Sequence, residues 1–206
     1  SSDVFVNFEY LWDEVDKKYS YFELKNVDWN AVKENYISKI YGDMGEDSLF
    51  NVLKAMLFEL RDDHTNLVSP FNVSVYQTDL SGPDNFNSRI VREFYLNHDL
   101  NYTGSLIHGF LDNKRVGYIR YASFMDNITD KEMDHVLNRY KETQGLILDL
   151  RKNGGGSIFM VPKILSRFVT QKTRVGSFRT RNGRGHNDFG PNEPFYITPH
   201  SGVRYL

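Results

Sequence analysis

The 206-residue sequence contains no cysteine. This absence excludes disulfide bonds, catalysis by a thiolate and zinc sites built on cysteine ligands. Long apolar runs are also lacking, because none approaches the ~20 residues that a membrane-spanning helix needs. The formal net charge is only −2, and charges of both signs are mixed along the chain. The sequence therefore offers no basic surface for nucleic acid or for an acidic membrane.

Apolar side chains, by contrast, are plentiful. Hydrophobic residues make up 40% of the chain and aromatic residues 15%, which is too apolar for a disordered protein. The length suffices for one sizeable domain or two small ones with a buried core. The sequence begins at Ser1 rather than at methionine, which predicts a processed or trimmed start, as after removal of a signal peptide.

The first third of the chain predicts three amphipathic helices. Apolar residues recur there at steps of three and four, the spacing of one helical face. The three stripes are Phe5, Phe8, Trp12, Val15, Tyr19 and Phe22; then Trp29, Val32, Tyr36 and Ile40; then Leu49, Leu53, Met56 and Leu60. Asp28 is placed to cap the second helix. We expect a small helical subdomain at residues 1–66.

The rest of the chain predicts a mixed α/β core at residues 67–206. Residues 67–104 are rich in turn formers and predict loops with edge strands, and residues 105–121 predict a hairpin. A helix is expected over 130–140, and the apolar run 145–150 predicts a strand buried on both faces of a sheet. A further helix follows, delayed by Pro162, and a last core strand is expected at 174–179.

The segment Asp149–Gly156 is the most informative part of the sequence. Its three consecutive glycines follow a predicted strand directly and precede a helix, so several backbone N–H groups can turn toward one point. Such a point binds an anion, which is either a phosphate or the oxyanion of an acyl-transfer intermediate. The phosphate interpretation lacks the Gly-Lys-Ser/Thr ending of a P-loop. A flexible strand-to-helix turn is the plainer alternative.

Three motifs in this sequence resemble a known family. Asp149-Leu-Arg-x-Asn-x-Gly-Gly156 resembles the glycine signature of the C-terminal-processing, or tail-specific, serine peptidases. Gly117-Tyr-Ile-Arg-Tyr121 with Phe124 resembles a strand of that family, and Leu60-Arg-Asp-Asp-His-Thr65 resembles its Leu-x-Asp-x-His-Thr turn. The motifs occur in the family's order and cover most of the chain.

This resemblance implies a ClpP/crotonase-like β-α core behind the N-terminal helical subdomain. It implies that Gly154 or Gly155 supplies an oxyanion-hole amide. In the tricorn-like branch it makes His64 the general base, whereas a lysine does that work in the processing branch. By itself, a histidine at a helix end is more often a surface residue. If His64 is the base, we expect its imidazole within about 10 Å of the glycine loop.

Two departures from the family pattern follow. The family's nucleophilic serine lies on a turn after the next core strand, and we expect this sequence to stop before it, which leaves the core incomplete at its C-terminus. Ser157 does not occupy the nucleophile's position. His64 and Gly117 are only 53 positions apart (117 − 64), so the PDZ domain that many members insert there does not fit.

Metal sites are poorly supported by the sequence. Two sets of possible ligands occur: the consecutive residues Asp62, Asp63 and His64, and the pair His186 and Asp188, two positions apart. Neither set has the ligand spacing of a known metal site. The polar, glycine-rich stretch 181–188 predicts a mobile surface loop, and substrate contact is the open alternative for it. We expect neither a metal nor an organic cofactor.

The sequence thus predicts part of a serine-type peptidase that acts through an acyl-enzyme and is inactive on its own. The alternative is a catalytically silent binding protein for peptides or lipophiles on the same fold, as in the family's interphotoreceptor retinoid-binding relative. A polypeptide is the expected partner and nucleic acid is not. The resemblance implies a location outside the cytoplasm, in the periplasm or at the cell surface. It leaves a peripheral or lipid-anchored membrane association and the oligomeric state open.

Overall fold

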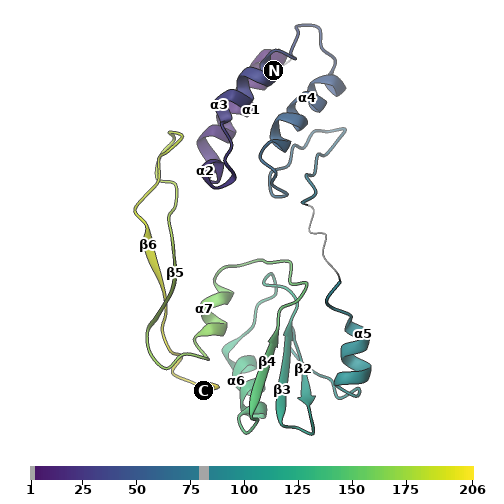
Figure 1. Ribbon diagram of the computed structural model, residues 1–206, viewed down its shortest axis with the longest axis vertical. Coiled ribbons are helices and arrows are strands. Elements are labelled where there is room, and N and C mark those ends of the chain that lie inside the picture. Colours follow the sequence, from purple (N-terminus) through teal and green to yellow (C-terminus); the bar gives the residue numbers. More distant parts are fainter. Residues whose placement is uncertain (1–2, 79–83) are drawn as a thin grey trace. The chain divides into compact units, whose positions relative to one another are not determined.

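The computed structural model describes residues 3–78 and 84–206. These residues form two compact units, shown in Figure 1. The first contains the described residues up to 78 together with Arg179–Asn192, and the second those from 84 to Phe178 together with Glu193–Leu206. The division predicted from the sequence, 1–66 and 67–206, stays a prediction. Among the described residues, no helix is both long and apolar enough to cross a bilayer.

The first unit holds four helices. They are α1 (Val4–Lys18), α2 (Phe22–Lys25), α3 (Trp29–Ile37) and α4 (Glu46–Phe58). Asp28 caps α3 as the sequence predicts, since its side chain accepts a hydrogen bond from the backbone N–H of Ala31. The first apolar stripe does not form one helix to Phe22, because the chain becomes extended at Tyr19 and α2 starts separately.

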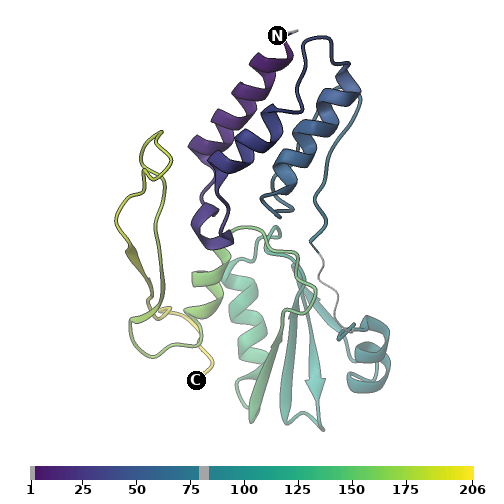
Figure 2. The same ribbon diagram turned by 45° about the horizontal axis from the view of Figure 1, so that its top comes forward.

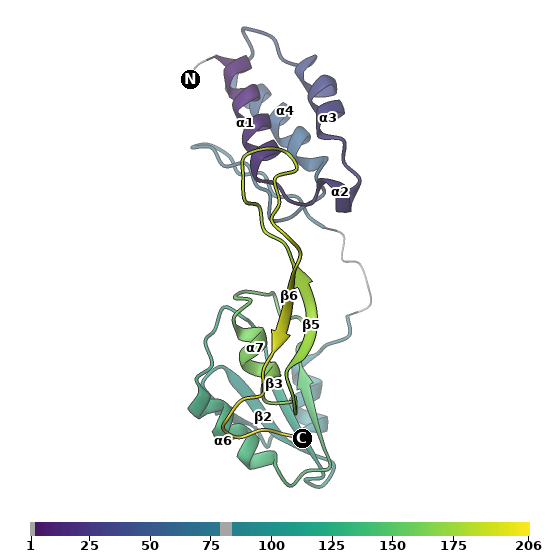
Figure 3. The ribbon, with the colours of Figure 1, turned by 90° about the vertical axis from the view of Figure 1, so that its left-hand side faces the viewer.

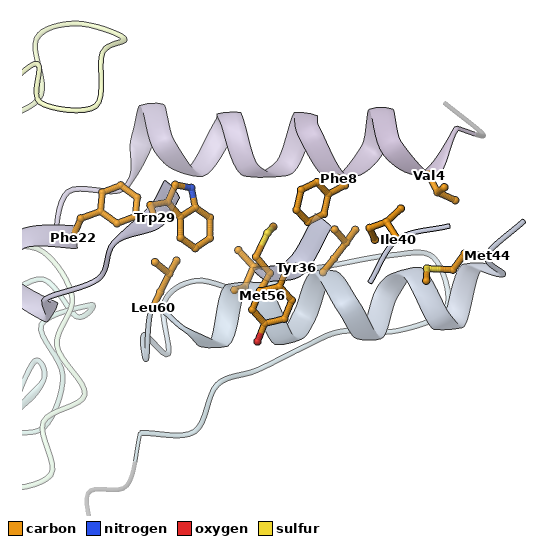
Figure 4. Close-up of a cluster of buried hydrophobic side chains, with 11 residues drawn as sticks. Val4, Phe8, Phe22, Trp29, Tyr36, Ile40, Met44, Met56 and Leu60 are labelled. Atoms are coloured by element: carbon orange, nitrogen blue, oxygen red, sulfur yellow. The ribbon is translucent and has the colours of Figure 1, made fainter. Parts of the chain in front are cut away.

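The core of this unit is built from the predicted stripes (Figure 4), except that Phe5 lies outside it and is 42% exposed. Phe8, Met56 and Leu60 are 0% exposed, and Trp29 is 1% exposed. The rings of Trp12 and Trp29 lie parallel at 6.5 Å, and each indole N–H donates to the other residue's carbonyl oxygen. Burying each such side chain stabilises the fold by about 1.5–3 kcal/mol, so the aromatic stripes are structural.

The second unit is built on a four-stranded sheet with the order β1-β2-β3-β4. Its strands are β1 (Asn101–Thr103), β2 (Leu106–Leu111), β3 (Val116–Tyr121) and β4 (Gly145–Asp149). β2 and β3 form the predicted hairpin, and β4 runs parallel to β3. The predicted α/β class is confirmed.

Helices lie on both faces of this sheet (Figures 1 and 2). On one face, α6 (Asp130–Tyr140) and α7 (Met160–Leu165) pack on inward-facing side chains such as Ile119. α6 begins with a capping box between Thr129 and Glu132. The short helices α5 (Ser88–Ile90) and η1 (Val91–Tyr95) lie on the other face, beside Tyr118.

Two strand predictions need correction. The apolar run 145–150 is not buried on both faces, because β4 is an edge strand and Ile147 is 46% exposed. The strand expected at 174–179 does not join the core sheet. It is β5 (Thr173–Phe178), which among the described strands pairs only with β6 (Glu193–Ile197) in a separate two-stranded sheet (Figure 3). All of its residues are exposed, since its polar and glycine positions leave no apolar face to bury.

A buried histidine makes the stability of the second unit depend on pH. His108 is 1% exposed, with Nε2 2.9 Å from Thr103 Oγ1 and Nδ1 2.7 Å from the hydroxyl of Tyr140. Burial lowers the pKa of His108 to about 4. The unfolded chain, with an ordinary pKa near 6.5, therefore binds this proton first as the pH falls.

We expect the contribution of His108 to be lost between about pH 6.5 and pH 4. Relative to a His108→Gln variant, which cannot titrate, the free energy of unfolding of the original chain should fall by about 2–3 kcal/mol between pH 7 and pH 4.5. Urea unfolding, monitored through hydrogen exchange at the β2 and β3 amides, measures this difference. If the difference in the free energy of unfolding between the two proteins stays constant with pH, His108 does not stay neutral in the folded chain and the prediction is contradicted.

Candidate active-site loop

The loop after β4 is anchored by a buried carboxylate. Asp149 is 4% exposed. The guanidinium of Arg151 donates two hydrogen bonds to it, from Nε to Oδ1 at 2.9 Å and from Nη2 to Oδ2 at 2.6 Å. The hydroxyl of Tyr118 donates to the same Oδ2 at 2.6 Å. The bonds from Arg151 foremost, and then that from Tyr118, hold the pKa of Asp149 well below its usual range, against the opposing effect of burial. The Asp-Leu-Arg part of the motif therefore acts as a structural clamp.

The chain then turns sharply and is fixed by an asparagine. The N–H of Asn153 donates to the carbonyl of Leu150, and Lys152 has a φ of +57°, as the third position of a type II turn requires. The Asn153 side chain donates from Nδ2 to the carbonyl of Tyr121 at 2.9 Å and accepts from the N–H of Gly155 at 2.8 Å. Asn153 thereby joins the end of β3 to the glycines, a role that needs the folded partner strand and was missed from the sequence.

The third glycine lies against the backbone that follows β3. Phe124 pairs with Gly156 as an isolated parallel bridge, in which the N–H of Phe124 donates to Gly155 and the N–H of Ser157 donates to Phe124. A Cβ on Gly156 would lie 2.2 Å from the carbonyl carbon of Phe124, and its φ is +140°. Only glycine fits at this position.

Two amides of this loop are free to bind a ligand. The two hydrogen bonds of this parallel bridge are made by Gly155 and Ser157, the neighbours of Gly156. Gly156 itself therefore turns its N–H away from Phe124, toward the open edge. Among the residues that the structure describes, the N–H groups of Gly154 and Gly156 have no hydrogen-bond acceptor. The N–H of Gly155 is engaged by Asn153. The described loop thus presents two N–H groups without an acceptor at an open edge, while the oxyanion role of Gly154 and Gly155 stays a prediction.

Substitution of the glycines should separate the tight position from the open one. We expect Gly156→Ala to lower the free energy of unfolding by about 2–4 kcal/mol, because both the clash and the positive φ are unfavourable for a side chain. Gly154→Ala is the matched control, since a Cβ there meets nothing within 4 Å, and its effect should stay within about 0.5 kcal/mol. Equal effects in denaturant titrations would show that the loop is not packed as described.

His64 lies in the first unit, just after α4. Its side chain is 91% exposed, with Nδ1 2.8 Å from Asp63 Oδ1 and 3.5 Å from Asp62 Oδ1. Asp62 also accepts the backbone N–H of His64 at 3.0 Å and the hydroxyl of Tyr19 at 2.8 Å. The turn is therefore ordered by Asp62, and the imidazole faces solvent with the carboxylates of Asp63 and Asp62 beside its Nδ1. The predicted proximity of His64 to the glycine loop, which belongs to the second unit, stays a prediction.

The other side chains singled out from the sequence have structural partners. Ser157 Oγ accepts the N–H of Phe159. His186 Nδ1 lies 2.6 Å from Asp16, with its ring stacked on Phe22 at 4.8 Å, so the 181–188 loop is fastened to the helices rather than free. Asp188 instead accepts the N–H of Gly185 within that loop.

One group of possible metal ligands occurs in the described part of the chain. Asp62, Asp63 and His64 each offer one ligand atom, and these atoms lie within 4.8 Å of one another. The carboxylate of Asp62 is already engaged by Tyr19 and by Lys25 at 3.3 Å. One of the three possible ligands, Asp62, therefore already stabilises the turn.

Two family models match the chain. Residues 115–197, which include the hairpin strand β3 and the glycine loop, match peptidase family S41. Residues 4–58, which include α1 to α4, match the tricorn protease C1 domain. The S41 match contains the Gly117–Phe124 and Asp149–Gly156 motifs, whereas the Leu60–Thr65 motif lies between the two matched ranges.

The chain is also similar to a solved structure over its whole length. A crystal structure of a peptidase candidate from Parabacteroides merdae ATCC 43184 is 35% identical, covers 100% of this chain and superposes with a TM-score of 0.88. This chain spans 65% of that protein's length. A photosystem II D1 C-terminal processing protease is 13% identical over 96% of this chain and 70% of that one, with a TM-score of 0.43. At that score the second likeness carries no argument.

Proposed function

We propose that this chain, which is an S41-family peptidase-like protein, supplies the oxyanion-binding part of a serine peptidase. The observation that carries the proposal is the anchored glycine loop, in which the N–H groups of Gly154 and Gly156 have no acceptor among residues 3–78 and 84–206. Preorganised backbone donors of this kind stabilise the negative oxygen of a tetrahedral intermediate, because they need no reorganisation when the charge develops.

In the proposed reaction a serine hydroxyl attacks the carbonyl carbon of a polypeptide substrate. A base takes the hydroxyl proton, and the carbonyl oxygen becomes an oxyanion that accepts hydrogen bonds from the loop. The proton then passes to the leaving amine, and water hydrolyses the acyl-enzyme. We propose His64 as the base, with Asp63 holding its Nδ1 at 2.8 Å so that Nε2 is free to receive the proton. A lysine outside this chain is the competing base.

We propose further that the nucleophile is not among residues 1–206. Ser157 follows the glycines, but its Oγ accepts the N–H of Phe159 at the start of α7. Within the described residues, β4 pairs with β3 alone, and this chain spans only 65% of its Parabacteroides relative. A further parallel strand beside β4 would end next to the glycine loop, because parallel strands end at the same edge of a sheet. A serine after such a strand would meet the free amides.

Labelling with a fluorophosphonate tests this proposal. The 206-residue chain should not react, whereas the natural protein that contains it should be modified at a serine outside these residues. Labelling of the 206-residue chain that disappears in Ser157→Ala would make Ser157 the nucleophile and overturn the assignment. A natural protein that never reacts would favour the non-catalytic binding protein instead.

We propose that the natural protein works outside the cytoplasm, on polypeptides. This proposal rests on the S41 relationship. Cell fractionation with a cytoplasmic marker protein as the control tests it, and recovery of the protein with that marker would contradict it.

A further inference from the structure

A cavity of about 470 Å³ lies on the opposite face of the sheet from α6. One wall is the sheet itself, with Leu111, Tyr118 and Ile147, and the other is the helical segment with Ile90 and Val91. The volume falls in the usual range for small-molecule sites. Its mostly apolar walls with few polar groups are also typical of such sites. No step of the proposed peptidase reaction uses this cavity.

The polar end of the cavity carries a surplus positive charge. Arg151 lines the cavity, and Arg120 stacks on Phe86 at 3.8 Å and donates to the carbonyl of Arg151 at 2.8 Å. Asp149 is the carboxylate shared by these two guanidinium groups, at 2.6 Å from Arg151 and 4.0 Å from Arg120. Two cations thus share one anion. The other charge there, Asp84, is neutralised by Lys152 at 2.9 Å.

Arg151 also keeps unused donors at this place. Its guanidinium has five N–H groups. Three are engaged, two by Asp149 and one by the carbonyl of Asn85 at 2.9 Å. In the part of the chain that the structure describes, the remaining N–H on each terminal nitrogen has no carboxylate or carbonyl acceptor, and the hydroxyl of Tyr118 is its polar neighbour. The side chain is 43% exposed, so an incoming oxyanion can reach it.

We propose that this cavity binds a small amphiphilic carboxylate, with its apolar body between Ile147 and Val91 and its carboxylate on Arg151. The walls match the apolar body, and the surplus charge with two free donors matches the anionic end. This site is separate from the oxyanion-binding amides and holds whether or not the protein is a peptidase.

Titration of the ¹⁵N-labelled 206-residue chain with octanoate tests the proposal by NMR. We expect saturable shifts at the amides of Ile90, Val91 and Ile147 with a Kd of about 1 mM or below, the affinity of a ligand of about ten heavy atoms. Octanol, which lacks the charge, and propionate, which lacks the apolar body, should each bind at least fivefold more weakly.

Two variants locate the site. Ile147→Glu puts a like charge into the wall at a 46% exposed position and should weaken octanoate binding at least tenfold, whereas Val6→Glu, a 51% exposed position on α1, should leave it unchanged. Absence of saturable shifts up to about 10 mM, about tenfold above the expected Kd, would overturn the proposal. Equal binding of octanol, or equal effects of the two variants, would overturn it as well.

Discussion

Replacing His64 with alanine in the natural protein should slow its modification by a fluorophosphonate by about 10²–10⁴-fold. A serine hydroxyl is a weak nucleophile until a base removes its proton, and general-base catalysis supplies an effect of that size. The measurement is the second-order rate constant of labelling at pH 8. Because the amides of Gly154 and Gly156 that we propose to bind the oxyanion do not depend on His64, a residual reaction above the rate in water should remain.

The control for this experiment is His135→Ala. His135 is an exposed histidine on α6, so its loss removes an imidazole without touching the proposed site, and the labelling rate should stay the same. If His64→Ala labels as fast as the original protein, His64 is not the base. A lysine outside this chain would then be the remaining candidate, and a pH profile of labelling that rises well above pH 7 would identify it.

Replacing Asp149 with alanine should lower the free energy of unfolding of the second unit by about 3 kcal/mol. The change removes a buried carboxylate that accepts hydrogen bonds from the partly exposed guanidinium of Arg151 and from the buried hydroxyl of Tyr118. Leaving the Tyr118 hydroxyl without its acceptor and breaking the charge-assisted bonds together cost about this much. Because the pKa of Asp149 is lowered in the folded state, its contribution is present above the unfolded pKa near 4. It should be lost only as the pH falls below that value.

The readout must follow the second unit. Both tryptophans of the chain, Trp12 and Trp29, lie in the first unit, so tryptophan fluorescence would report on the wrong part of the molecule. Hydrogen exchange at the β3 amides is suitable. Asp126→Ala, which removes an exposed carboxylate near the same loop, is the control and should change stability by less than about 0.5 kcal/mol. An equally small effect of Asp149→Ala would refute the clamp.

Local patterns predicted much of the fold. The helix expected over 130–140 is α6, the hairpin at 105–121 is β2 with β3, and Asp28 caps α3. Each of these features depends on residues close in sequence, which is why spacing and capping rules find them. The resemblance through three motifs likewise agrees with the S41 and tricorn matches.

Contacts between distant residues could not be predicted in the same way. His186 is 170 positions from its partner Asp16, and β5 leaves the core sheet for β6. At the candidate site the sequence indicated the glycines but not how they are held. Asp149 requires the hydroxyl of Tyr118, and Asn153 requires the carbonyl of Tyr121, so both roles exist only once β3 and β4 have paired.

The central claim is that the loop Asn153–Gly156 binds the oxyanion of a serine peptidase. The most direct test is a crystal structure of the natural protein after reaction with diisopropyl fluorophosphate. We predict that the phosphoryl oxygen lies about 2.7–3.1 Å from the nitrogen of Gly154, Gly156 or both, the range of oxyanion donors, with the phosphorus on a serine outside residues 1–206. An adduct whose oxygen faces other groups, or a protein that forms no adduct, would contradict the claim.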